Sequence, residues 1–206
     1  MVTDNADSPE SRGPGRPREF DLDAALDRAI AAFSELGYHA TSLSKLTDAM
    51  EITEGSLYKA FRDKRAVFLA AFSRYLRQRN DRLVFELASA RTGREKVKAV
   101  LTVYAENSYG KAGRQGCLVV GSAVDLATSD PEMAKRAAGV LAGHEKRLAG
   151  FIRQGQEDGS ISSQIDSAVT ARLLLCVLQG MRVLGKTGRS RDEMDRLIDP
   201  AMKLLD

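Results

Sequence analysis

The chain has 206 residues, 43% of them hydrophobic and only 6% aromatic, and its formal net charge is +3. This composition excludes a disordered or fibrous protein, allows one or two domains with their own cores, and carries too little charge to indicate nucleic-acid binding by itself. With two cysteines and two histidines, we expect neither a disulfide framework nor a metal site, and we expect no cofactor. No apolar run approaches the roughly 20 residues that span a membrane, so we expect a cytoplasmic protein without a membrane partner.

Residues 1–19 are rich in Asp, Ser, Pro and Gly and are expected to form a disordered basic arm. Within this arm, the run RGPGRPR at 12–18 resembles the Gly-Arg-Pro core of AT-hook arms, which bind the minor groove of A·T-rich DNA. We therefore expect Arg16 and Arg18 to reach into a minor groove. An ordinary solvated tail is the alternative interpretation.

Two helices are predicted after the arm. Apolar residues recur every three or four positions between Asp21 and Gly37, which indicates an amphipathic helix that ends at the glycine. A second helix is expected to begin at Thr41, whose hydroxyl can cap a free amide, and to end at a turn around Glu51. These two helices would support the element that follows.

A third helix is predicted to open at Thr53, a second good cap. The residues expected to be buried are Leu57, Ala60 and Phe61. Those expected to face outward are Glu54, Gly55, Ser56, Tyr58 and Lys59. Small and hydrogen-bonding residues crowded into the first two turns are typical of a recognition helix, whose leading residues reach base edges. A surface helix pair in any α-helical protein is the alternative.

The run TSLSKLTDAMEITEGSLYKAFRDKRAVF at 41–68 resembles the DNA-binding domain of the TetR family of bacterial transcriptional regulators. The residues that match the family pattern are Thr53, Gly55, Leu57, Tyr58, Phe61 and Lys64. Members of the family usually have Gly at the turn, where this chain has Glu51. If that position is left-handed, its side chain costs about 1 kcal/mol or more.

The helical period continues beyond this region. Asp63 is expected to cap a long helix that ends near Ser89, and the stretch from Gly110 to Gly116 is expected to interrupt the pattern. Further helices are expected at 117–127, 130–156, 166–184 and 190–205. Because no strand alternation is found, we predict an all-α protein.

We predict three parts: the arm at 1–19, a three-helix helix-turn-helix DNA-binding domain at 20–64, and a helical effector-binding and dimerisation domain at 65–206. The last two helices have broad apolar faces, and Ala171, Gly180 and Ala201 would allow a neighbouring backbone to approach closely. The resemblance implies a homodimer that buries these two helices in a four-helix bundle. Their apolar faces would otherwise serve the core of the same chain.

The resemblance also implies a repressor that releases double-stranded operator DNA when a small-molecule effector binds. Expected to contact DNA are Thr41, Ser42, Thr53, Glu54, Gly55, Ser56, Tyr58, Lys59 and Lys64, together with Arg16 and Arg18 of the arm. Candidates for the effector pocket are Phe85, Tyr104, Cys117, Phe151 and Met181, all on apolar helix faces. Because no buried charge is evident, an apolar or weakly polar effector is favoured over a highly charged one.

Two other sequence features suggest chemistry. The run GMRVLGKT at 180–187 matches the P-loop pattern, but too little chain follows it to supply the rest of a nucleotide site. A nucleotide-binding enzyme therefore remains an alternative only, as does a helical interaction adaptor without a DNA role, and we expect no enzymatic activity. Cys117 at a helix start is a candidate redox or electrophile sensor, although a buried inert thiol is more common; Cys176 is expected in the core.

Overall fold

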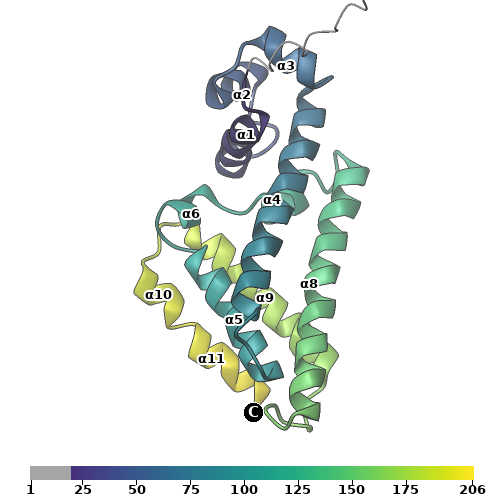
Figure 1. Ribbon diagram of the computed structural model, residues 1–206, viewed down its shortest axis with the longest axis vertical. Coiled ribbons are helices and arrows are strands. Elements are labelled where there is room, and N and C mark those ends of the chain that lie inside the picture. The colour runs from purple at the N-terminus through teal and green to yellow at the C-terminus, as the bar shows by residue number, and fades with distance from the viewer. Residues whose placement is uncertain (1–19) are drawn as a thin grey trace, which may run out of the picture.

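The computed structural model describes residues 20–206 and shows an elongated, helical molecule in which the described residues form no strand (Figure 1). The helices of the N-terminal end are α1 (Leu22–Leu36), α2 (Leu43–Met50), α3 (Glu54–Ala60) and α4 (Lys64–Leu87). Those that follow are α5 (Gly93–Glu106), α6 (Gly110–Gln115), α7 (Leu118–Asp125), α8 (Pro131–Glu157), α9 (Ser167–Gly185), α10 (Arg191–Asp195), α11 (Ile198–Met202) and the 3-10 turn η1 (Lys203–Leu205). The all-α prediction is confirmed.

Side-chain caps fix where these helices begin. Thr53 and Asp63 cap α3 and α4 as the sequence predicted, and Asp21 caps α1; each accepts a hydrogen bond from a backbone amide in the first turn. Asp130 does the same for α8, and Pro131 occupies its first helical position. These starts are predictable because a cap acts through residues only two or three positions away.

α4 joins the two ends of the molecule. It begins beside α3, packs along α1 and continues between the remaining helices (Figure 1). Its first half, from Val67 to Tyr75, belongs to a core with α1, α2 and α3, to which α7 and Met133 of α8 also contribute. Its second half contributes Leu83 to a separate core formed with α5, α8, α9, α10 and α11. A movement of α4 would therefore change the packing of both cores.

Two predicted elements differ in the structure. The stretch expected to break the helical pattern contains the short helix α6, which ends at Gly116, a residue with a φ of 89°. The single helix expected at 190–205 is divided into α10, α11 and η1, which lie along α5. The spacing of apolar residues alone does not show where the backbone ends one helix and begins the next.

α9 is the one helix in the described part of the chain that is long and apolar enough to cross a membrane by length and composition, with a mean hydropathy of 1.4. The expectation that no apolar run approaches this length was therefore wrong. α9 packs against α8 and α5, and a core helix of a globular protein passes the same test. One third of that stretch is buried within the chain, so much of its surface is left for another contact.

Candidate nucleic-acid interface and effector cavity

α3 is anchored by one side chain and presents most of the others to solvent. Leu57 is fully buried in the N-terminal core, whereas Tyr58 is 54% exposed. Of the predicted contact residues in α3, Glu54, Gly55 and Lys59 are also exposed, and Ser56 is partly buried. Ala60 is exposed, so its predicted burial was wrong. The outward face expected of a recognition helix is therefore present.

The Thr53 hydroxyl organises the start of α3. Its Oγ1 accepts a hydrogen bond from the Ser56 amide at 3.1 Å and lies 3.0 Å from the Ser56 hydroxyl. The pair leaves both residues on the outer surface at the leading end of the helix. Because the cap satisfies an amide that has no partner within the helix, Thr53 shapes this surface in addition to being part of it.

Thr41 is not at the surface. Its side chain is fully buried, and its hydroxyl donates to the Gly37 carbonyl at 2.7 Å. The cap of α2 is Ser42, whose Oγ accepts from the Lys45 amide at 3.2 Å. The predicted roles of Thr41 as a cap and as a DNA contact were therefore wrong, and Ser42 takes the first of them. Both hydroxyls suit a cap by sequence; the path of the loop selected between them.

Lys64 is also turned inward. Its ammonium donates to the carbonyl oxygens of Tyr38 and Thr41, both at 3.1 Å, and lies 4.3 Å from the centre of the Tyr38 ring. The predicted phosphate contact does not fit this geometry, because the ammonium already ties α4 to the loop between α1 and α2.

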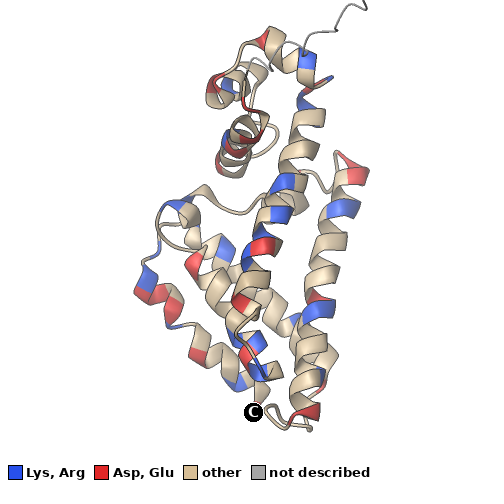
Figure 2. Cartoon of the chain, in the orientation of Figure 1, with Lys and Arg blue, Asp and Glu red and all other residues tan. Residues whose placement is uncertain are grey.

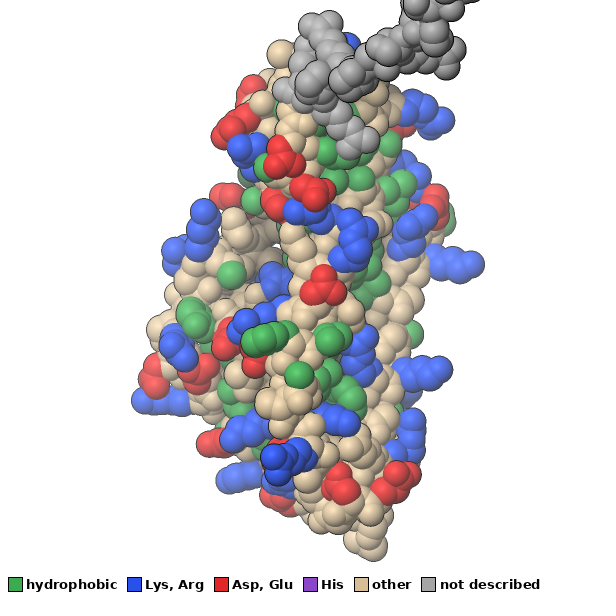
Figure 3. Space-filling model, viewed as in Figure 1, with side chains coloured by type: hydrophobic (Ala, Val, Ile, Leu, Met, Phe, Trp, Pro, Cys, Tyr) green, Lys and Arg blue, Asp and Glu red, His purple; other side chains and the backbone are tan. Residues whose placement is uncertain are grey.

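Basic residues are not confined to the end of the molecule that carries α3. Figure 2 shows that Lys and Arg occur along the whole molecule, and Figure 3 shows the same on one face.

Sequence reasoning missed two exposed residues at the start of α2. Ser44 and Lys45 face solvent beside Ser42, at the same end of the molecule as α3. The sequence could have indicated their exposure, because the apolar stripe that includes Leu46 and Met50 leaves Ser44 and Lys45 on the opposite face of α2. Arg16 and Arg18 lie outside the described residues.

Glu51 forms the turn between α2 and α3 in a left-handed conformation, with φ 56° and ψ 44°. It is the only non-glycine residue with a positive φ among residues 20–206. Its carboxylate pairs with Arg28 of α1 at 2.7 Å, and the same guanidinium donates to the Met50 carbonyl. The condition under which a side chain at this position carries a conformational cost is therefore met.

A cavity of about 280 Å³ lies between α4, α5, α8 and α9, with α7 closing one side. Tyr104 and Cys117 line it, as predicted. The other three candidates do not: Phe85 is 71% exposed on α4, Met181 is 1% exposed in the core, and Phe151 packs against that core. An apolar face cannot by itself tell a pocket from a core.

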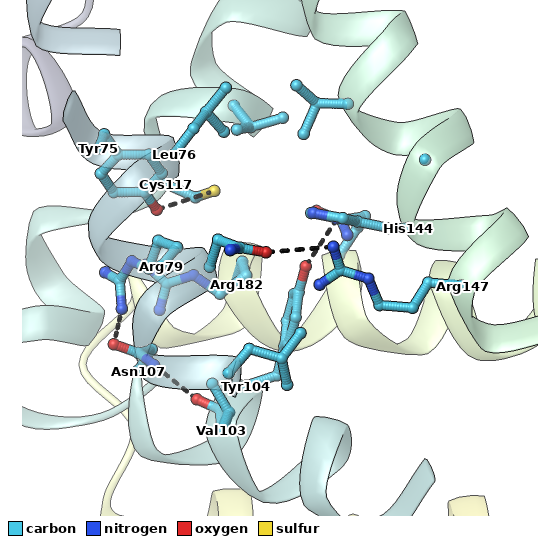
Figure 4. Close-up of a pocket in the computed structure, with 16 residues that line it drawn as sticks. Tyr75, Leu76, Arg79, Val103, Tyr104, Asn107, Cys117, His144, Arg147 and Arg182 are labelled. Atoms are coloured by element: carbon cyan, nitrogen blue, oxygen red, sulfur yellow. Dashed lines mark hydrogen bonds between the residues drawn. The ribbon is translucent and has the colours of Figure 1, made fainter. Parts of the chain in front are cut away.

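The cavity wall contains polar side chains that face one another (Figure 4). The Tyr104 hydroxyl lies 3.1 Å from Nδ1 of His144, and the Tyr75 hydroxyl donates to Cys117 Sγ at 3.4 Å. Burial lowers the pKa of His144 from its ordinary value, helped by the charge of Arg147, which favours the neutral imidazole. Burial also raises the pKa of Tyr104 to about 12.

Three arginines line the same cavity and were not predicted from the sequence: Arg79, Arg147 and Arg182. Arg182 is only 3% exposed. The expectation that this site contains no buried charge was therefore wrong. The helical spacing of Tyr75 and Arg79 places them on one face of α4, but only the packing of α9 shows that Arg182 faces the same space.

Two further sequence interpretations fail. The P-loop match lies within α9 and its C-terminal end, where a P-loop would need a loop between a strand and a helix. The Lys186 ammonium donates to the carbonyls of Ser34 and Glu35 in α1, both at 3.1 Å. Cys176, expected in the core, is exposed on α9. We therefore discard the nucleotide-binding alternative.

Two family models match the chain. "Bacterial regulatory proteins, tetR family" matches residues 25–71, and "Tetracyclin repressor-like, C-terminal domain" matches residues 93–200. The HTH-type transcriptional repressor ComR of Escherichia coli (strain K12) is 30% identical over 209 residues, which cover 99% of this chain and 97% of ComR. The chain belongs to the TetR family. It is a DNA-binding transcriptional regulator with the helix-turn-helix domain of that family.

Solved structures of TetR-family regulators agree with this identification. A cysteine mutant of the regulator CifR in complex with 26-bp double-strand operator DNA has a TM-score of 0.82 and 30% identity, covering 91% of this chain and 98% of the CifR chain. The regulator FadR from Bacillus subtilis, in complex with stearoyl-CoA, has a TM-score of 0.70 and 18% identity, covering 90% and 97%. At that identity, FadR shows the shared fold alone.

Proposed function

We propose that this TetR-family regulator is a homodimeric repressor that binds operator DNA through α3 and releases it when a small molecule occupies the cavity. The observation that carries the proposal is the position of α4. This helix starts four residues after the end of α3 and forms a wall of the cavity with Tyr75 and Arg79. A ligand that displaces α4 would therefore displace the recognition helix.

The DNA-binding part of the proposal rests on the exposed face of α3. Glu54, Gly55, Tyr58 and Lys59 face outward there, and helix-turn-helix proteins place such a face in the major groove. Ser42 and Thr53 would position the domain on the backbone. ComR is named a repressor, and the CifR structure contains operator DNA, which supports the same activity here.

Dimerisation is proposed through α9, with α8 beside it. The exposed apolar residues of α9 recur at helical spacing and form a stripe, which we call the α9 face: Val169, Leu173, Cys176, Val183 and Leu184. Gly180 lies along it and has open space where a side chain would be. An unpartnered apolar stripe of this kind is typical of a subunit interface.

The burial of the final segment, α10 and α11, supports a role in the core of the same chain. Met194, Ile198 and Ala201 turn inward to the core, and Ala171 of α9 does the same. The outer surface of α10 and α11 consists mostly of charged residues. We therefore propose α9 for the interface but not the final segment, since apolar spacing reveals that a face is buried but not which partner buries it.

Two sets of contacts could transmit a change from the cavity to α3. Arg65, in the first turn of α4, pairs with Asp130 and Glu132 at the start of α8. At the other end, Lys186 after α9 holds the carbonyls of α1 described above. Helices α8 and α9 both line the cavity, so each is connected to the DNA-binding end by charged contacts.

The test is operator binding by the purified protein, with DNA upstream of its own gene, at fixed salt. Tyr58→Ala should weaken binding by about ten-fold or more, because base and phosphate contacts of this kind contribute about 1–3 kcal/mol. Phe85→Ala is the matched control, since Phe85 is an exposed aromatic residue far from α3. Equal affinities for the two variants would contradict the assigned interface.

A second trigger is proposed at Cys117. Its thiol is partly exposed, lies on the cavity wall and accepts a hydrogen bond from Tyr75, so a modification there would occupy the same space as a ligand. Treatment with a mild oxidant should release operator DNA from the wild type and from Cys176→Ser, but not from Cys117→Ser. Release that depends on Cys176 alone would rule out this second route.

A further inference from the structure

The most unusual feature of the cavity is a buried positive charge with uncharged partners. Nη2 of Arg182 donates to the Gly116 carbonyl, but Nη1 is buried and has no hydrogen-bond partner among the described residues. Removing a charged group from water is costly unless hydrogen bonds and an opposite charge compensate for it. Arg182 lies in the last turn of α9, where the helix dipole offers partial compensation only.

A second donor lies beside it on the same helix. Nε2 of Gln179 is also buried and makes no hydrogen bond of good geometry among residues 20–206, although its side chain lies close enough to the Tyr104 hydroxyl to lower the pKa of that group against the larger effect of burial. Gln179 and Arg182 are three positions apart, so they share one face of α9, and both line the cavity. A charged donor without a partner and a poorly satisfied amide donor on the same face therefore point to an acceptor with two oxygen atoms.

The rest of the wall is also positive. Arg79 donates to the amide oxygen of Asn107, and Arg147 donates to that of Asn80 at 3.1 Å (Figure 4). Neither forms an ion pair with a carboxylate among the described residues. None of the described residues that line the cavity is acidic. The aliphatic part of the wall is formed by Leu76, Leu83, Val103, Val119 and Val140.

We propose that the cavity binds a small organic carboxylate whose oxygen atoms accept hydrogen bonds from Arg182 and Gln179 and whose apolar part packs against the aliphatic wall. This inference rests on the ligand-responsive function proposed above and corrects the apolar or weakly polar effector expected from the sequence. A carboxylate supplies both the negative charge and the two acceptors. The volume of about 280 Å³ is at the lower end of ligand pockets, which favours a short or single-ring acid.

Arg182 also offers a connection to the DNA-binding end. It lies one helical turn before Lys186, which holds the end of α1, and its guanidinium contacts Gly116, directly before Cys117 and α7. A carboxylate that draws Arg182 toward the cavity would act on both contacts. The ligand would thus change the arrangement of α1 relative to α9.

The experiment is calorimetric titration of the full chain with propanoate, butanoate, hexanoate and benzoate, each beside its neutral amide, and with inorganic phosphate. At least one carboxylate should bind saturably, and at least about ten-fold more tightly than its amide, since a hydrogen bond to a charged group is worth that factor. No preference of any acid over its amide would overturn the proposal. Phosphate binding without carboxylate binding would also overturn it.

Three variants locate the site. Arg182→Met and Gln179→Leu should each weaken carboxylate binding by about ten-fold or more, and Arg153→Met, an exposed arginine of α8, should leave it unchanged. If Arg182→Met fails to fold, carboxylate binding by Gln179→Leu decides whether the site is correctly located. Binding unaffected by the folded variants would contradict the assignment.

Operator binding is measured separately on the same preparations without any acid. Loss of DNA binding with intact carboxylate binding would contradict the proposed function but not this site. DNA binding without carboxylate binding would contradict only the inference.

Discussion

The guanidinium of Arg65 holds the carboxylate of Asp130 through two hydrogen bonds, at 2.8 and 3.2 Å, and thereby joins the first turn of α4 to the cap of α8. The pair connects the helix that follows α3 with a helix that carries His144 and Arg147 of the cavity wall. Asp130 is 19% exposed, so this is one of the better-shielded ion pairs at the junction.

This pair should give a defined acid dependence. The hydrogen bond from Arg65 is the main cause that lowers the pKa of Asp130 from 3.8 to about 2. Because the folded pKa is below the unfolded one, the stabilisation is complete above pH 3.8 and is lost as the pH falls toward 2. Urea unfolding from pH 6 to 3 should show wild type more stable than Asp130→Asn, which keeps a good cap, with the difference shrinking below about pH 4.

The control repeats this comparison in an Arg65→Met background. There the difference in stability between the proteins with and without Asp130→Asn should be smaller and vary less with pH. An unchanged pH dependence would disprove the assignment to this pair.

Lys64 should behave as a structural residue. Lys64→Met removes two hydrogen bonds from an ammonium, so unfolding should become easier by about 1.5–3 kcal/mol. The slope of operator affinity against salt should stay the same, because the ammonium already faces two carbonyls. Lys59→Met is the control: Lys59 is exposed on α3, and the slope of operator affinity against salt should fall by about one in this variant. If instead Lys64→Met lowers the slope by the same amount, Lys64 does contact a phosphate.

Glu51 should be sensitive to the shape of its replacement. Glu51→Val places a branched side chain in a left-handed conformation and should unfold more easily than Glu51→Asn by about 1–2 kcal/mol. Both variants lose the pair with Arg28, so the comparison isolates the backbone. Chemical denaturation measures the difference, and equal stabilities would show that the turn readjusts.

The α9 face should control oligomeric state. Leu173→Glu puts a charge into the proposed interface and should raise the dimer dissociation constant by about thirty-fold or more, as expected for an interface residue worth about 2 kcal/mol. Val84→Glu, at an exposed apolar position on α4, is the control. Light scattering over a dilution series distinguishes them, and a Leu173→Glu protein as dimeric as the control would place the interface elsewhere.

The cap of α3 separates stability from recognition. Thr53→Ala should lose about 1 kcal/mol of stability and weaken operator binding, whereas Thr53→Ser should keep the cap and the stability. If Thr53→Ser nevertheless binds the operator more weakly, the threonine methyl group contributes to the DNA contact. Thermal unfolding and operator titration on the same samples give the two quantities.

The sequence by itself determined the local features of this protein: the caps at Thr53 and Asp63, the turn around Glu51 and the outward face of α3. Each depends on residues within a few positions of one another, where helix geometry leaves little choice. Only the tertiary structure decided that Thr41 and Lys64 are turned inward, that Phe85 is outside the cavity, and that Arg182 lies within it. Those outcomes depend on which distant helix covers a given face, and a periodic apolar pattern carries no information about the identity of that neighbour.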